Sequence, residues 1–292
     1  MLGLCSRVAS RGMVRAVRCM ATSAPGSSAL PREVEKFAAI SHQWWNETSP
    51  EFGGLHRMND VRVPLVELAG DLPGAHVLDV GCGGGILTEA LARRGAHVVG
   101  VDAGQANVAA AAAHAAGRCL GEGSVTYGAV LVEDLLPHVL GQGGEAPPPK
   151  GEDGAPLLQN VPAGGFDVVV TSETVEHVAD PRAFLRDCAS AVRPGGALVV
   201  TTINRTAASF ALAIVAAEVV LGIVPHGTHS WRQFVTPGEV MQAVPELSLE
   251  RSQGFAYNPL TGKWCVTRDT SVNYGLVLRK AAQPQSADSE QA

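Results

Sequence analysis

The sequence has no excess of basic residues and no paired cysteines. Its 22 lysines and arginines are outnumbered by 28 aspartates and glutamates, which gives a net charge of −6 and a pI near 5.8. Such a chain has no basic field to attract a nucleic acid, so we expect no nucleic-acid partner. Six cysteines occur without any C-x-x-C pair: Cys5, Cys19, Cys82, Cys119, Cys188 and Cys265. This scatter argues against a structural zinc site and a disulfide scaffold, and indicates reduced thiols.

Acidic residues are absent from the amino terminus, where none precedes Glu33. Four arginines lie in this segment: Arg7, Arg11, Arg15 and Arg18. They interrupt any long hydrophobic run, which excludes a secretory signal peptide. We interpret residues 1–30 as a cleaved organellar transit peptide, with a disordered basic tail as the alternative. The arginine spacing fits a mitochondrial destination better than a plastid one.

The sequence also lacks an uninterrupted hydrophobic run of membrane-spanning length. Residues 206–224 are apolar almost throughout, but Glu218 falls inside the run, and a crossing needs ~20 apolar residues. We predict a helix that packs on the domain and offers an apolar face to a hydrophobic substrate or a membrane surface. Ordinary core packing is the alternative.

Strand and helix patterns alternate from residue 76 onward. Strand-like segments lie at 76–82, 97–104, 124–130, 166–172 and 197–203, and helical patterns at 85–96, 104–117 and 181–192. This alternation predicts a mostly parallel, doubly wound α/β sheet with helices on both faces. We expect a single domain over residues 31–280, with helices within 33–72 and a Gly- and Pro-rich surface insertion at 141–165. Residues 281–292 are expected to be a disordered tail.

A glycine-rich loop, "VGCGGG", follows the first strand and opens a helix. Gly81, Gly83 and Gly85 allow a tight turn with no Cβ between the backbone and a ligand. The dinucleotide pattern G-x-G-x-x-G fails at Ile86, which favours a ligand without a pyrophosphate. Asp102 closes the second strand, where it can accept hydrogen bonds from the two ribose hydroxyls of an adenosine. A plain tight turn is the alternative for the loop, and Asp79 beside it could attract a cationic or amino group.

Three titratable residues, Glu173, Glu176 and His177, follow the fourth strand. Residues just past the carboxyl end of a strand face the ligand crevice in such sheets. If a helical turn begins at Thr174, the three side chains lie on one face at i, i+3 and i+4, an arrangement that suits a divalent cation. The alternative is that the two glutamates cap the next helix, where negative charge is favourable by about 0.3–1 kcal/mol. The residues alone leave both interpretations open.

Several of these motifs together resemble one family. The chain is similar to the Rossmann-like class I S-adenosylmethionine-dependent methyltransferases, and in more detail to the ubiquinone-biosynthesis O-methyltransferases, which act on prenylated dihydroxybenzoates and demethylubiquinol. The resemblance runs from about Phe37 to Lys280 and rests on "LHRMN", "VLDVGCGGG", "GVDAG", "SETVEHVADP", "INRT" and "GTH". The insertion at 141–165 departs from the family's pattern.

The resemblance implies particular roles. Arg62, Gly81, Asp102 and Ser172 would contact S-adenosylmethionine, with Arg62 pairing with its methionine carboxylate. The cluster after the fourth strand would bind Mg²⁺ or another divalent ion. The substrate would be a prenylated catechol, and the protein would associate peripherally with the matrix side of the mitochondrial inner membrane as a member of a ubiquinone-synthesis complex.

The chemistry explains why such an enzyme would use a metal. A phenol, which ionises near pH 10, attacks a sulfonium methyl group better as the phenolate. A magnesium ion that binds both oxygens of a catechol lowers this pKa and orients the attacking oxygen. Histidine matches magnesium poorly, so His177 is alternatively the general base or a group behind the metal ligands. Other candidate bases are His226 and His229, with exposed loop positions as the alternative.

Further polar and aromatic residues have weaker interpretations. Asn204 and Arg205 could meet a substrate carboxylate or lie in a solvated turn. An aromatic lid or ordinary core packing would account for four residues: Trp44, Trp45, Phe52 and Trp231. Two other functions remain open, namely a nicotinamide-dependent oxidoreductase and a non-catalytic scaffold of a quinone-synthesis complex.

Overall fold

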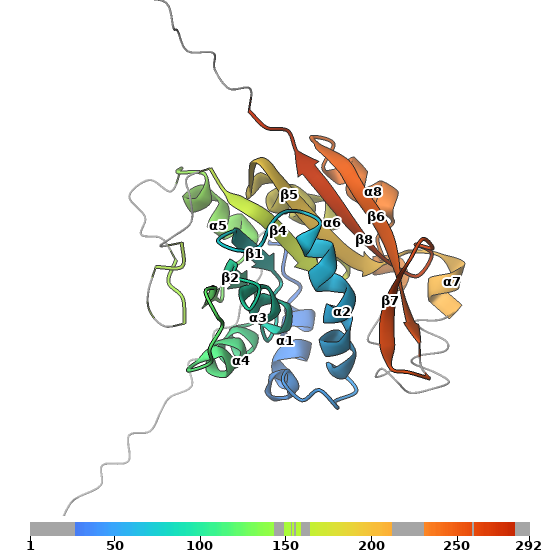
Figure 1. Ribbon diagram of the computed structural model, residues 1–292, viewed down its shortest axis with the longest axis horizontal. Coiled ribbons are helices and arrows are strands. Elements are labelled where there is room, and N and C mark those ends of the chain that lie inside the picture. The colour runs from blue at the N-terminus through green and yellow to red at the C-terminus, as the bar shows by residue number, and fades with distance from the viewer. Residues whose placement is uncertain are drawn as a thin grey trace, which may run out of the picture.

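The computed structural model describes residues 27–142, 149–152, 154, 156–158, 164–211, 231–258 and 260–283. These residues form one mixed eight-stranded sheet in the order β3-β2-β1-β4-β5-β8-β6-β7, with helices on both faces (Figure 1). The strands are β1 (His76–Val80), β2 (His97–Val101), β3 (Ser124–Gly128), β4 (Phe166–Ser172), β5 (Val192–Ile203), β6 (Leu247–Asn258), β7 (Lys263–Thr267) and β8 (Asn273–Lys280). The prediction of a doubly wound α/β fold is confirmed.

The helices precede and connect these strands. The α-helices are α1 (Pro31–Ala39), α2 (Gly53–Glu67), α3 (Ile86–Ala92), α4 (Gln105–Ala115), α5 (Val132–Val139), α6 (Pro181–Ser190), α7 (Ala207–Ser209) and α8 (Pro237–Ala243). Short 3₁₀ turns are η1 (Ser41–Gln43), η2 (Val175–His177) and η4 (Trp231–Gln233). No helix in this part of the chain is long and apolar enough to cross a bilayer.

The five amino-terminal strands run parallel. β1 lies between β2 and β4, with Leu78 opposite Val99 on one side and Val169 on the other. The carboxyl ends of β1, β2 and β4 therefore meet at one edge of the sheet, which is where a ligand crevice forms in such folds.

Strand side chains alternate between two cores, because successive residues of a strand point to opposite faces. Val77 and Val168 belong to the core under α2 and α3. Their neighbours Leu78 and Val169 belong to the core under α5, α6 and α8. Both faces of the strands are thus buried, which accounts for their nearly continuous hydrophobic sequences.

The helices begin where the sequence provides caps. Asp180 caps α6, its Oδ1 accepting hydrogen bonds from the N–H groups of Arg182 (2.9 Å) and Ala183 (3.1 Å), and Pro181 occupies the first helical position. Thr236 and Glu239 form a reciprocal capping box at α8. Such caps satisfy amide groups that have no partner inside the helix.

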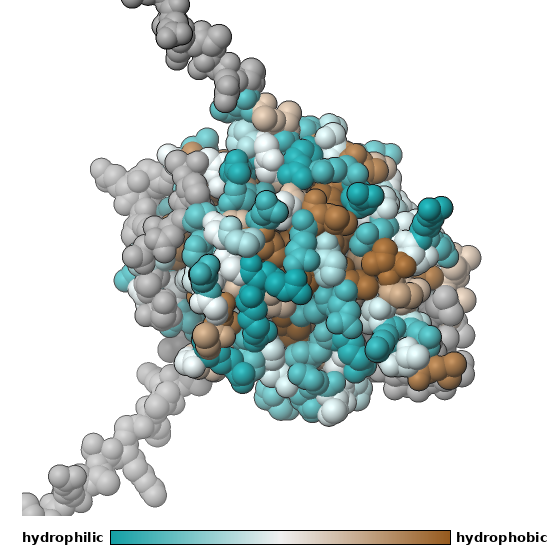
Figure 2. Space-filling model, viewed as in Figure 1, coloured by the Kyte–Doolittle hydropathy of each residue, from teal (hydrophilic) through white to brown (hydrophobic). Residues whose placement is uncertain are grey.

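The carboxyl-terminal part of the sheet was not predicted. β8 pairs antiparallel with β5, and β6 pairs antiparallel with β8 and β7. β5 begins at Val192, whereas the predicted strand begins at residue 197, so the fifth strand is longer than predicted. In the apolar segment expected to be a helix over 206–224, only α7 is described, and residues 212–230 lie outside the described part of the chain. The face seen in Figure 2 is mainly hydrophilic, with small separate hydrophobic patches.

Gly254 of β6 provides a test of how the carboxyl-terminal strands pack. A Cβ at this position would come within 1.7 Å of the backbone oxygen of Asp269. We expect Gly254→Ala to lower the free energy of unfolding by about 1–3 kcal/mol, because the β7–β8 connection must shift. The matched control is Gly54→Ala in α2, where nothing lies within 4 Å, and it should be neutral or slightly stabilising. Equal urea midpoints for the two variants would contradict this account of the packing.

Candidate active site

A cavity of about 1040 Å³ opens at the carboxyl edge of β1, β2 and β4. All seven predicted site residues line it: Arg62, Gly81, Asp102, Ser172, Glu173, Glu176 and His177. The cavity continues to the β6–β7 hairpin, where Phe255, Tyr257 and Trp264 form a further wall. The parallel strands thus bring the predicted cofactor and acidic residues into one cavity.

The glycine loop has the backbone conformation that the sequence predicts. Gly81, Gly83 and Gly85 have φ angles of 76°, 53° and 83°, in the left-handed region that favours glycine. The close contacts come from the chain itself, because a Cβ at Gly81 would lie 2.3 Å from Thr174 and one at Gly83 would lie 2.4 Å from Trp44. These glycines are therefore needed for packing, as well as for any approach of a ligand.

Two buried aspartates lie beside the loop. Asp102 Oδ2 accepts a hydrogen bond from the Gly83 N–H (3.0 Å), and Oδ1 accepts from Gly104 N–H (2.7 Å) and Asn107 Nδ2 (3.1 Å). Burial raises the pKa of Asp102 against the effect of these donors. Burial also raises the pKa of Asp79 to about 6, although Thr88 donates to it at 2.6 Å. Both groups would gain from donors or positive charge on a ligand.

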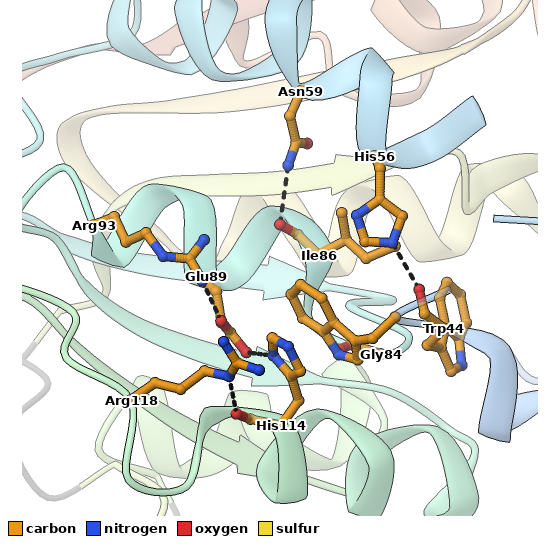
Figure 3. Close-up of polar contacts among 10 residues, drawn as sticks. Trp44, His56, Asn59, Gly84, Ile86, Glu89, Arg93, His114 and Arg118 are labelled. Atoms are coloured by element: carbon orange, nitrogen blue, oxygen red, sulfur yellow. Dashed lines mark hydrogen bonds and ion pairs between the residues drawn. The ribbon is translucent and has the colours of Figure 1, made fainter. Parts of the chain in front are cut away.

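Aromatic residues of the amino-terminal segment pack on the loop. The Trp44 ring stacks on Phe52 at 3.8 Å, and its Nε1 donates to Asn107 Oδ1 at 3.0 Å. Figure 3 shows His56 and Asn59 of α2 pointing toward Trp44 and Ile86, whose carbonyl oxygens they contact at 2.8 and 3.0 Å. Trp44 and Phe52 line the cavity, so this segment forms one of its walls.

A second aromatic contact holds the same segment in place. Trp45 donates from Nε1 to the Gly84 carbonyl at 2.9 Å and stacks on His114 of α4, with the ring centroids 3.3 Å apart. His114 contacts the fully buried Glu89 of α3, which also pairs with Arg93, each at 2.6 Å (Figure 3). Trp44 and Phe52 pack on the glycine loop and also line the cavity, so the lid prediction and the packing alternative describe one arrangement for these two residues. Trp45 is outside the cavity lining and packs on His114 and Gly84.

Arg62 lies almost fully buried on α2. Its Nε and Nη2 donate to Asn59 Oδ1 at 3.1 and 2.6 Å, Nη2 also donates to Leu55 O (2.8 Å), and Nη1 donates to Ser172 Oγ (3.1 Å). Burial lowers the pKa of Arg62 to about 10, and the charges of Glu173 and Asp79 oppose this shift. One N–H of Nη1 has no partner among the described residues, which leaves a donor that a carboxylate can use.

Hydroxyl groups of β5 hold the two glutamates. Thr201 Oγ1, which contacts Ser172 Oγ at 2.8 Å, donates to Glu173 Oε1 at 2.8 Å. Thr202 Oγ1 donates to Glu176 Oε2, also at 2.8 Å. Burial, followed by the charge of Glu176, raises the pKa of Glu173 to about 7. Glu173 has φ 53°, and this backbone strain is typical of functional positions.

His177 has a different partner from the one expected. Its Nδ1 lies 3.1 Å from Glu33 Oε2 on α1, and the ring meets Phe37 edge-on at 5.3 Å between centroids. Burial opposes protonation, but the hydrogen bond that His177 donates to Glu33 and the charge of Glu176 together leave the pKa of His177 raised. A carboxylate that fixes Nδ1 leaves Nε2 as the second nitrogen for chemistry.

The geometry revises the expected metal cluster. Only a 3₁₀ turn beginning at Val175 is present, so Glu173 lies outside it and the helical-face argument is wrong. Among the described residues, no three His, Cys, Asp or Glu side chains are arranged to hold a metal ion. A site formed by the two carboxylates still suits magnesium, because magnesium takes one or two protein carboxylates and completes its shell with other oxygens. The capping alternative is wrong for α6, since Asp180 provides that cap.

Other predicted residues lie away from the cavity. Arg205 pairs with Glu239 and donates to Phe234 O at 3.1 Å, while Asn204 Nδ2 donates to Thr270 O at 2.9 Å. Their interpretation as carboxylate-binding groups is therefore not supported. His226 and His229 lie outside the described residues, and the exposed Trp231 donates to Thr206 O at 3.0 Å.

Several site residues were missed by the sequence analysis. They are Glu33, Asn59, Asn107, Thr201, Thr202 and Trp264. The sequence could have indicated the two threonines as site residues, since they bear hydroxyl groups near the carboxyl end of a buried strand. Glu33 and Trp264 carried none, because only the tertiary fold brings α1 and β7 to this edge of the sheet.

Comparison with known proteins identifies the class. A family model described as a methyltransferase domain matches residues 55–252. A solved methyltransferase from Thermotoga maritima, described as a possible histamine N-methyltransferase, superposes with a TM-score of 0.52 at 14% identity, over 86% of this chain and 100% of that chain, which shows the fold alone. The fold and the domain match define an S-adenosylmethionine-dependent methyltransferase of class I.

Sequence relatives narrow the class to a family. The ubiquinone biosynthesis O-methyltransferase of Maricaulis maris (strain MCS10) is 40% identical over 264 residues, covering 86% of this chain and 93% of that protein. The protein of the same name from Methylobacterium sp. (strain 4-46) is 41% identical over 277 residues, covering 89% and 99%. The chain belongs to the family of the ubiquinone biosynthesis O-methyltransferases. The nicotinamide-dependent alternative is therefore wrong.

The raised pKa of Glu173 predicts a pH-dependent stability. Its folded value of about 7 exceeds the ordinary 4.5, so between these pH values the folded state holds a proton that the unfolded chain has released. Stability is therefore lost as the pH rises through this window. With chelator present, we expect Glu173→Gln to match the wild type at pH 4.5 and to exceed its free energy of unfolding at pH 8 by up to about 3 kcal/mol.

Denaturant titrations across this pH range measure the effect. The control is Glu67→Gln, because Glu67 forms an exposed ion pair with Arg94. Its free energy of unfolding should differ from that of the wild type only by the small amount that is usual for a surface ion pair. A Glu173→Gln difference that stays constant from pH 4.5 to 8 would show that the carboxyl group titrates normally.

Proposed function

We propose that the protein transfers a methyl group from S-adenosylmethionine to a phenolic hydroxyl of a polyprenylated dihydroxybenzoate, of demethylubiquinol, or of both, in ubiquinone biosynthesis. The observation that carries the proposal is the single cavity in which the cofactor residues, the acidic residues and an aromatic hairpin wall meet. The family membership supports the same reaction.

The residues on β1, β2, β4 and α2 would bind the cofactor. The remaining Nη1 donor of Arg62 is suited to the methionine carboxylate, and the free lone pairs of the Asp102 carboxylate are suited to ribose hydroxyls. Asp79 and Glu173 place negative charge on the same cavity, which favours a positively charged sulfonium ion. These contacts would hold the methyl group near the acidic residues.

Glu173 and Glu176 would hold Mg²⁺ or another divalent ion. The ion, when bound, supplies Lewis-acid chemistry that lowers the pKa of a coordinated catechol. The support comes from two carboxylates in one cavity, one of which has its pKa raised to about 7 by burial and by the other's charge. His177, oriented by Glu33 through Nδ1, would accept the phenolic proton at Nε2. The phenolate oxygen then forms a bond to the methyl carbon as the carbon–sulfur bond breaks.

We also propose a location and partners for the protein. Residues 1–30 contain four arginines and no acidic residue, which supports import into mitochondria. The hydrophobic substrate supports peripheral binding to the matrix side of the inner membrane. Membership of a ubiquinone-synthesis complex would place the enzyme close to the source of its poorly soluble substrate. The whole domain is expected to span residues 31–280, with the insertion at 141–165 on its surface.

A double variant tests the catalytic proposal. We expect Glu173→Gln, Glu176→Gln to lower kcat by at least about a hundredfold, because the charge that activates the phenol is lost. The assay follows labelled methyl transfer from S-adenosylmethionine to a short-tailed dihydroxybenzoate, with and without chelator. The matched control is Glu67→Gln, Glu250→Gln, which removes two exposed glutamates paired with Arg94 and Arg279.

The outcomes separate the parts of the proposal. Methyl transfer that persists in chelator would contradict the proposed role of a metal ion and leave the proposed methyl-transfer reaction intact. Unchanged turnover in the double variant would favour the scaffold alternative. Failure of the wild type to methylate any catechol, with the cofactor bound, would overturn the proposed substrate class.

An import experiment tests the proposed location. Residues 1–30 fused to a fluorescent protein should direct it to mitochondria, since this segment combines four arginines with no carboxylate. Replacing the arginines at positions 7, 11, 15 and 18 by glutamine should leave the fusion outside the organelle. Mitochondrial import that survives these replacements would contradict the electrostatic explanation.

A further inference from the structure

The glycine loop is a segment that is costly to order. Gly81, Gly83 and Gly85 have φ angles of 76°, 53° and 83°, and Gly84 adds a further residue without a side chain. Glycine loses more conformational freedom on folding than any other residue. A loop of this composition would fluctuate in the free protein unless contacts with the rest of the chain hold it. Contacts that hold the loop in advance reduce the entropy that is lost when a ligand binds to it.

Two consecutive tryptophans of the amino-terminal segment provide contacts of this kind. The Trp44 ring packs so closely on the loop that a Cβ at Gly83 or Gly84 would lie 2.4 or 2.2 Å from it. Trp45 Nε1 donates a hydrogen bond to the Gly84 carbonyl oxygen at 2.9 Å. Trp44 lines the cavity together with Gly83, whereas Trp45 lies outside the cavity lining. Trp45 therefore holds the loop without taking up space that a ligand needs.

The indole of Trp45 is itself held by groups of α3 and α4. Its ring stacks on His114 with the centroids 3.3 Å apart and the planes 8° from parallel. His114 Nδ1 lies 2.6 Å from the carboxylate of Glu89, which is fully buried and also pairs with Arg93 (Figure 3). Glu89 and His114 lie outside the cavity lining, like Trp45. A buried carboxylate thus orients an imidazole, and the imidazole orients the indole that contacts the loop.

We propose that Trp45 is a positioning residue for S-adenosylmethionine, which acts through the glycine loop and does not touch the cofactor. Its indole N–H fixes the Gly84 carbonyl group and the peptide planes beside it, while Glu89 and His114 fix the indole. The neighbouring Gly83 N–H donates to Asp102 Oδ2 at 3.0 Å, so the held loop also orients a carboxylate suited to ribose hydroxyls. The inference rests on the cofactor site of the proposed function and adds to it three residues outside the cavity.

Trp45→Phe removes the N–H donor and keeps a ring on which His114 can stack. We expect the Kd for S-adenosylhomocysteine, measured by calorimetry, to rise about threefold to thirtyfold, which corresponds to about 0.7–2 kcal/mol at 1.4 kcal/mol per tenfold. The KM for S-adenosylmethionine should rise by about the same factor, and the KM for a short-tailed dihydroxybenzoate should stay within about twofold. An unchanged Kd would overturn the inference. The matched control is Trp231→Phe, which removes an indole hydrogen bond to the Thr206 carbonyl and should leave all three constants unchanged.

A double variant tests whether His114 acts through Trp45. His114→Ala alone should raise the Kd for S-adenosylhomocysteine, because an unsupported indole can leave the Gly84 carbonyl. In the Trp45→Phe background this hydrogen bond is already lost, so His114→Ala should change the Kd by less than about twofold. Equal effects of His114→Ala in the two backgrounds would show a general loosening of the fold and would overturn the proposed chain of contacts.

Amide exchange in the wild-type protein covers the case in which the variants do not fold. The N–H groups of Gly83 and Gly85, which donate to Asp102 Oδ2 (3.0 Å) and Cys82 O (2.9 Å), should be protected in the ligand-free protein. Rapid exchange of both amides, slowed only by S-adenosylhomocysteine, would overturn the inference and leave the proposed function intact. Failure of the wild type to bind S-adenosylhomocysteine would count against the proposed cofactor site.

Discussion

A buried arginine connects the elements on which the cavity depends. Arg62 of α2 donates to Ser172 at the end of β4, Ser172 contacts Thr201 of β5, and Thr201 donates to Glu173. A buried guanidinium needs acceptors and opposite charge to offset its desolvation, and here the carboxylates of Asp79 and Glu173 provide that charge. The positive charge of Arg62 and the negative charges of the two carboxylates therefore offset each other. A ligand carboxylate that accepts a hydrogen bond from the remaining N–H of Arg62 would join this existing network.

The two glutamates at the same edge of the sheet depend on hydroxyl donors of β5. Each glutamate has a single threonine donor, and Thr201 and Thr202 are consecutive residues of β5, so their side chains leave opposite faces of the strand. Burial raises the pKa of Glu173, and repulsion by the charge of Glu176 adds to this shift. A cation or a proton would relieve this repulsion. The free protein is thus ready to accept positive charge at this edge of the sheet.

Sequence patterns predicted the parallel half of the fold and most of the site. β4 begins and ends at the predicted residues because "FDVVVTS" is a short, fully buried run between polar segments. The glycine loop and Asp102 were predicted for a similar reason, since their backbone and charge requirements are local. The helical-face argument for Glu173 failed because a left-handed residue interrupts the turn, and propensity does not foresee such strain.

Long-range packing accounts for what the sequence patterns did not predict. Glu33 lies 144 residues from His177, and their contact depends on α1 folding back over the carboxyl edge of the sheet. β6, β7 and β8 were missed although "YGLVLR" and "LSLERSQGF" have strand-like stretches, because no local signal says where such strands join a sheet. The sequence likewise left both an aromatic lid and core packing open for Trp44. The structure shows both, since Trp44 packs on the glycine loop and also lines the cavity.

The antiparallel strands pair with the edge of β5 and also add aromatic residues to the cavity wall. A parallel sheet that ended at β5 would leave unpaired backbone groups on a long strand, and β8 satisfies them over Ala197–Ile203. β6 and β7 continue the sheet beyond β8, and their aromatic side chains line the cavity. The parallel half presents charged groups to the cavity, among them Asp79, Asp102 and Glu173. The antiparallel half presents the aromatic side chains of Phe255, Tyr257 and Trp264, so the two halves of the sheet line the cavity with different kinds of side chain.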